Sequence, residues 1–92
     1  MVSKISDSEF IIRVQAELIR GRTKFPNPQG SMTALTEEVG ELAKALLDEP
    51  WERVIEEAVQ VAVMAIRVAT EGDPTLISYR RQNPTTKEID NN

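Results

Sequence analysis

Residues 58–69 read Ala-Val-Gln-Val-Ala-Val-Met-Ala-Ile-Arg-Val-Ala, and this segment decides how the rest of the chain can fold. It lies within residues 50–71, whose length and spacing of apolar residues predict a helix. Apolar side chains lie nearly all the way round that helix, so it must be buried on more than one side. A chain of 92 residues can hardly surround a helix by itself. We therefore expect this helix to form the centre of an oligomer interface.

A second helix precedes this segment. Apolar residues recur there at spacings of three and four, at Met32, Leu35, Val39, Leu42 and Leu46, and predict a helix that begins near Ser31. Asp48-Glu49-Pro50 forms the connecting turn, because proline suits the first position of a helix. The two helices are expected to pack as an antiparallel hairpin, which forms the body of the fold.

The N-terminal part of the chain predicts a further helix. Ser6 and Glu9 have the spacing of a capping box, and apolar residues follow at helical intervals to about Arg20, where Gly21 would end the helix. Residues 21–30 contain two prolines and two glycines and are expected to form a loop. This loop is long for a helix–helix connection, and such loops are often functional. Lys24, Arg22 and Asn27 are its candidate contacts to an anion or a base, and a plain solvated linker is the alternative interpretation for each of them.

The C-terminal part contains a short helix and a tail. Gly72 would close the long helix, and Asp73-Pro74 would start a fourth one. From residue 82 onward the sequence is polar. The predicted fold is all-α, a small helical bundle built on a central antiparallel helix hairpin and completed by homo-oligomerisation. Residues 1–81 would form its single domain and residues 82–92 a flexible tail.

Composition excludes several classes of function. The net charge of −4 and the scattered basic residues argue against binding of a nucleic acid polymer. The chain has no cysteine and no histidine, so any chemistry depends on carboxylates, lysine, arginine, hydroxyls or a bound ion. No segment reaches the roughly 18 apolar residues of a membrane span, and no targeting segment is apparent. We expect a cytoplasmic protein without a membrane partner.

Three carboxylates gather on the predicted second helix. Glu37, Glu38 and Glu41 project from neighbouring positions of one face and flank the apolar stripe, where a partner helix can reach them. Like charges at this spacing repel each other, and a hard cation such as Mg²⁺ would turn that repulsion into attraction. A solvated acidic face is the alternative interpretation.

A second polar group lies on the next helix, where Glu56, Glu57 and Gln60 share a face. Glu41 lies about eight residues before the turn and Glu57 about eight after it, so both lie about 12 Å from the turn. Because Glu41 and Glu57 lie at equal distances from the turn, one shared site is favoured. Gln60 needs partners if it is buried, and it is either an interhelical hydrogen bonder or a member of that site.

The two groups together resemble a known family. Glu37-Glu38-Val39-Gly40-Glu41, followed after the turn by Glu57-Ala58-Val59-Gln60, is similar to the paired E-E-x-x-E and E-x-x-D motifs of the MazG-like, all-α nucleotide pyrophosphohydrolase superfamily. The resemblance covers roughly residues 24–73. It implies a helical homo-oligomer, dimer or tetramer, that uses Mg²⁺ to hydrolyse a nucleoside or deoxynucleoside triphosphate to the monophosphate and pyrophosphate.

The resemblance also implies roles for individual residues. Glu38, Glu41 and Glu57 would be metal ligands, and Glu37 and Glu38 would be catalytic, with Glu37 helping to orient the attacking water. Glu56 and Gln60 would bind the metal or lie just outside its ligands. Lys24 and Arg67 would contact the phosphates or the base of the substrate.

The chain departs from the motif at Gln60, where the family has aspartate. An amide can still offer an oxygen to a metal, but it adds no charge and cannot act as a base. Two alternatives to an active enzyme therefore remain open. One is a relative that binds nucleotide without turnover, and the other is a non-catalytic helical oligomerisation or binding module.

Overall fold

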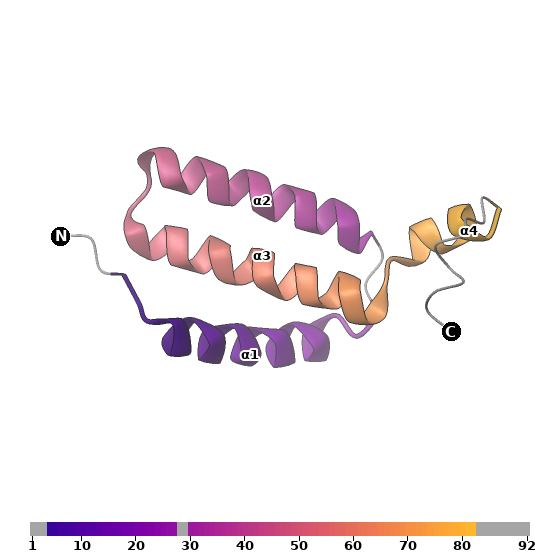
Figure 1. The fold of residues 1–92 in the computed structure, drawn as a ribbon, viewed down its shortest axis with the longest axis horizontal. Helices are drawn as coiled ribbons and strands as arrows, with labels where there is room; N and C mark the ends of the chain where they lie inside the picture. The colour runs from indigo at the N-terminus through magenta and orange to yellow at the C-terminus, as the bar shows by residue number, and fades with distance from the viewer. Residues whose placement is uncertain (1–3, 28–29, 83–92) are drawn as a thin grey trace.

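The computed structural model describes residues 4–27 and 30–82, and this part of the chain contains helices and no strand. The helices are α1 (Asp7–Lys24), α2 (Ser31–Asp48), α3 (Trp51–Glu71) and α4 (Pro74–Gln82). α3 lies between α1 and α2 and packs against both, whereas α4 extends away from the other three (Figure 1). The prediction of an all-α fold is confirmed. No described helix is long and apolar enough to cross a membrane.

The start of α1 agrees with the prediction, but its end does not. Ser6 accepts a hydrogen bond from the backbone N–H of Glu9 (3.1 Å), as a capping residue does. The predicted end at Arg20 is wrong, because the helix continues through Gly21 to Lys24. Phe25 ends it, with φ −131° and ψ 76°. A residue that precedes a proline avoids the helical region, so Pro26 explains this end better than Gly21 does.

Other boundaries follow the predictions closely. α2 begins at Ser31 after Gly30 (φ 68°), and α3 ends at Glu71, directly before Gly72 (φ 76°). Pro50 precedes the first turn of α3 instead of occupying its first position. Gln82, the first residue of the predicted tail, belongs to α4. The rest of the predicted tail, residues 83–92, and loop residues 28–29 lie outside the described residues.

The core is small and is centred on α3. It contains Val14 from α1 and Ile55, Val59 and Val63 from α3, with partly buried side chains packed against it, among them Phe10, Leu18, Trp51 and Ile66. Ala45 of α2 and Val54 of α3 are buried as well. Two helices of the same chain therefore cover much of the apolar circumference of α3.

Only part of the apolar stripe of α2 is covered. Leu35 and Leu42 are partly buried, on the same side as the buried Ser31 and Ala45. Met32, Val39 and Leu46 are 44%, 49% and 57% exposed. α2 is thus rotated so that one edge of the stripe stays open to solvent.

Candidate functional site

Glu38 of α2 and Glu57 of α3 lie close enough together for their carboxyl groups to interact. Glu57 is buried and Glu38 is half-buried. The pKa of the Glu38 carboxyl is raised, first because burial disfavours its charged form and then because the charge of Glu57 lies beside it. Glu41 and Glu37 add weaker repulsion from the same helix. Sequence spacing predicted a meeting of the two motifs, and the structure brings them together through Glu38.

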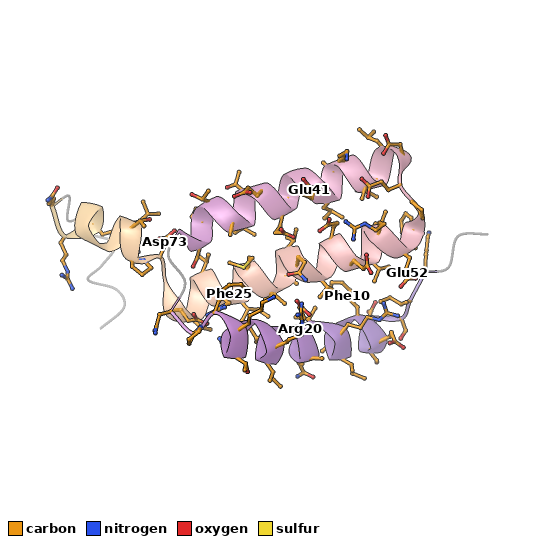
Figure 2. The ribbon with its side chains drawn as sticks, turned by 180° about the vertical axis from the view of Figure 1, so that it is seen from behind. Phe10, Arg20, Phe25, Glu41, Glu52 and Asp73 are labelled. Atoms are coloured by element: carbon orange, nitrogen blue, oxygen red, sulfur yellow. The ribbon has the colours of Figure 1, made fainter. Side chains whose placement is uncertain are left out.

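The remaining predicted carboxylates are less closely gathered. Glu37, Glu41 and Glu56 are exposed, and Figure 2 shows Glu41 on α2. Within residues 4–27 and 30–82, no three acidic side chains stand close enough together to form a ready metal site.

Arg53 neutralises Glu57, a role that sequence reasoning missed. Its Nη2 donates to Glu57 Oε2 (2.8 Å) and its Nη1 donates to Glu56 Oε1 (2.5 Å), while its Nε lies 3.5 Å from Glu49 Oε1. The signal was available in the sequence, since Arg53 stands three and four positions before Glu56 and Glu57 on one helix.

Gln60 is an interhelical hydrogen bonder, and its partner comes from α1. Its Nε2 donates to Glu17 Oε2 (2.9 Å), and Arg20 donates to the same carboxylate (2.6 Å). Arg20, and then Gln60, lower the pKa of Glu17 against the opposing effect of burial. An aspartate at position 60 would face the carboxylate of Glu17, so an amide donor fits this position. Glu17 is a site residue that motif comparison could not reveal, because it lies outside both motifs.

A cleft of about 490 Å³ lies between α1 and α3 beside these residues. We call it the arginine cleft, and its polar lining comprises Arg13, Arg20, Arg53, Glu17, Glu56, Glu57 and Gln60. Figure 2 shows Arg20 on the side of α1 that faces α3. The three arginines and three glutamates balance in charge.

A second cavity of about 430 Å³ shares Glu17, Arg20 and Gln60 with the arginine cleft. We call it the Phe25 cavity, and its other lining residues include Lys24, Phe25, Ala34, Val63, Met64 and Arg67. The structure thus brings the two predicted substrate residues, Lys24 and Arg67, to one cavity. Lys24 Nζ lies 5.6 Å from the centre of the Phe25 ring.

Arg67 is tied to its surroundings. It is 3% exposed, and it donates to the backbone oxygens of Gly21 (3.3 Å) and Phe25 (2.7 Å) and to Glu71 (2.9 Å). Its guanidinium therefore holds the end of α1 against α3.

Comparisons of this chain with family models, with curated protein sequences and with solved structures found no match.

Proposed function

We propose that this protein is a Mg²⁺-dependent nucleotide pyrophosphohydrolase, which converts a nucleoside or deoxynucleoside triphosphate to the monophosphate and pyrophosphate. The observation that carries the proposal is the contact of Glu38 with Glu57, one carboxylate from each of the two motifs. Two carboxylates held together at partial burial repel each other, and a cation between them would relieve that repulsion.

The donor atoms are of the kind that a hard cation prefers. Glu38, Glu41 and Glu57 would hold Mg²⁺ through carboxylate oxygens, with Glu41 turning from solvent toward the other two. Glu56 is exposed on α3 and pairs with Arg53, whereas Gln60 is engaged with Glu17. When bound, Mg²⁺ supplies positive charge that offsets the phosphates and lowers the pKa of a bound water.

The chain's own residues would position water and substrate. Glu37, exposed on α2, and Glu38 would orient the attacking water and accept its proton. Lys24 at the Phe25 cavity would contact the phosphates or the base. Arg67 would act mainly through the cavity wall that it holds in place.

The test is release of pyrophosphate from a panel of nucleoside and deoxynucleoside triphosphates, with Mg²⁺ and with a chelator. Wild-type protein should release pyrophosphate only with Mg²⁺, and the double change Glu38→Gln, Glu41→Gln should abolish release without unfolding the chain. Asp48→Asn, an exposed change on the same helix, is the matched control. Absence of release from every triphosphate would contradict the enzyme.

A non-catalytic alternative then makes its own prediction. A module that binds nucleotide should gain thermal stability with Mg²⁺ and nucleotide, because a ligand that binds only the folded state stabilises it. A plain oligomerisation module should respond to neither.

We also propose that α2 and α3 form a hairpin that a second copy of the chain completes, as a dimer or tetramer. The support is the exposed apolar edge of α2, formed by Met32, Val39 and Leu46. In the described residues, Ser31 is the largest side chain that is fully buried, so the monomer has a thin core. Small domains commonly offset such a core by association.

A further inference from the structure

Two arginines of the arginine cleft lie closer to solvent than a carboxylate with which they pair. The Arg20 side chain is 65% exposed and its partner Glu17 20%. The Arg53 side chain is 48% exposed and its partner Glu57 10%, while its other partner Glu56 is 53% exposed. Arg13 lies at the edge of the cleft and pairs with the more exposed Glu9 and Glu52 (3.3 Å each). An anion that enters the cleft can therefore reach Arg20 and Arg53 before it meets Glu17 and Glu57.

Guanidinium groups from two helices converge there, Arg13 and Arg20 from α1 and Arg53 from α3. The planar fork of arginine matches the oxygens of a phosphate group and donates to two of them at once. Glu57 is buried, so Arg53 can leave it only if another cation compensates the carboxylate, whereas Arg20 is 65% exposed and can leave Glu17 at a smaller cost. The geometry suits a ligand with several phosphate groups in a row.

We propose that the arginine cleft binds the phosphate chain of the nucleotide by exchanging partners: the phosphates take Arg20 and Arg53 from Glu17 and Glu57, and the released carboxylates face the divalent cation. That the ligand is a nucleotide rests on the proposed function. The exchange of arginine partners rests only on the residues that line the arginine cleft.

Charge balance makes the exchange depend on both ligands. Three arginines and three glutamates in the lining cancel, so a polyphosphate that enters alone leaves an excess of negative charge. A divalent cation removes that excess. Each ligand should therefore raise the affinity of the cleft for the other by the same factor.

Titration calorimetry of the full chain with pyrophosphate tests the proposal, in buffer with Mg²⁺ and in metal-free buffer. Arg20→Gln should weaken binding with Mg²⁺ by about tenfold, as expected for loss of a charge-assisted pair. Arg81→Gln is the matched control, because Arg81 is exposed on α4 and does not line the cleft. It should stay within about twofold of the wild type, since a remote exposed charge contributes little.

A second variant changes affinity in the opposite direction. Glu17→Gln removes the competitor for Arg20, so pyrophosphate should bind more tightly in metal-free buffer. If the Arg20–Glu17 pair were merely structural, Arg20→Gln and Glu17→Gln would not change the affinity for pyrophosphate in opposite directions. Thermal unfolding of each variant shows that it is folded.

Two results would overturn the proposed binding of phosphates in the arginine cleft. One is that wild-type protein does not bind pyrophosphate with Mg²⁺, and the other is that Arg20→Gln protein binds it as tightly as the wild type does. If the wild type hydrolyses triphosphates while Arg20→Gln leaves both KM and pyrophosphate binding unchanged, phosphate binding in the cleft is contradicted and the proposed function is supported. If the wild type binds pyrophosphate through Arg20 but hydrolyses no triphosphate, phosphate binding in the cleft is supported and the proposed function is contradicted.

Discussion

Glu38 is a residue whose surroundings disfavour its charge. Its carboxylate is half-buried and lies close to the carboxylate of Glu57. Burial and a neighbouring like charge both disfavour the ionised form. An ordinary structural position on α2 would carry a neutral side chain here. This makes the stability of Glu38 variants informative independently of catalysis.

Glu38→Gln should stabilise the ion-free protein at pH 7. The amide removes one charge and can donate to the Glu57 carboxylate, for a gain of roughly 0.5–1 kcal/mol. That gain raises the midpoint of thermal unfolding by about 2–8 °C in a domain of this size. Glu41→Gln, on the exposed side of the same helix, is the control and should change the midpoint less. A lower midpoint for Glu38→Gln would show that the charged pair is not a source of strain.

Asp73 is a buried carboxylate that caps α2 from the far end of α3. Its oxygens accept from the backbone N–H of Met32 (2.8 Å) and from the N–H and hydroxyl of Thr75 (2.9 and 2.6 Å). The sequence predicted Asp73 only as the start of the last helix. The bond to Met32 spans 41 positions, and such a contact is not visible in a local pattern.

The Asp73 cap should make stability depend on pH. The Thr75 hydroxyl first, and then the Met32 N–H, hold the pKa of Asp73 below its usual value of 3.8. A lowered pKa in the folded state means that the stabilisation is present above pH 3.8 and is lost as the pH falls through the folded value. Asp73→Asn should therefore lower stability at pH 7 and reduce the loss between about pH 5 and pH 2, measured by urea unfolding. An unchanged pH profile would contradict the cap.

At the scale of the helices, the sequence was most informative where one residue constrains the backbone. Gly30 and Gly72 adopt positive φ and mark the boundaries predicted for α2 and α3. Gly21 misled the prediction, because glycine is tolerated within a helix and Pro26 supplies the stronger stop. Periodicity predicted that each helix exists. It did not reveal what each helix contacts.

The periodicity of α2 did not predict correctly which of its side chains are covered by the rest of the molecule. Large apolar residues predicted a core stripe, but only Leu35 and Leu42 of it are partly buried, beside Ser31 and Ala45, and Met32, Val39 and Leu46 are exposed. The rotation of α2 brings Glu38 to Glu57 while Glu41 stays exposed. The motifs predicted that α2 and α3 bring carboxylates together, and Glu38 and Glu57 do lie close to each other. The choice among the three glutamates depends on packing that a single sequence does not encode locally.

The joint between α1 and α3 depends on Arg67. Arg67→Lys should lower the free energy of unfolding by about 2–4 kcal/mol, because a lysine cannot reach both backbone oxygens and Glu71 in one plane. Chemical denaturation measures the change. Arg22→Lys, at the exposed partner of the same Glu71, is the control and should cost less than about 1 kcal/mol. Equal costs at the two positions would contradict the tether.

At the scale of the whole molecule, the arginine cleft and the exposed apolar edge of α2 involve different helices. Glu57, Gln60, Arg53 and Glu17 line the cleft between α1 and α3, whereas Val39 and Leu46 are exposed on α2.

Self-association through the apolar edge of α2 should be visible in solution. Wild-type protein should sediment as a dimer or tetramer, and its unfolding midpoint should rise with concentration, because association stabilises the folded chain. The double change Val39→Glu, Leu46→Glu should produce monomers, since it places charges in the centre of the interface. Leu47→Glu is the matched control: Leu47 is 84% exposed and is displaced from the edge by one helical position, so the assembly should persist. A wild-type protein that remains a 10.3 kDa monomer at all concentrations would contradict the second copy. In that case the exposed edge of α2 would need a different partner.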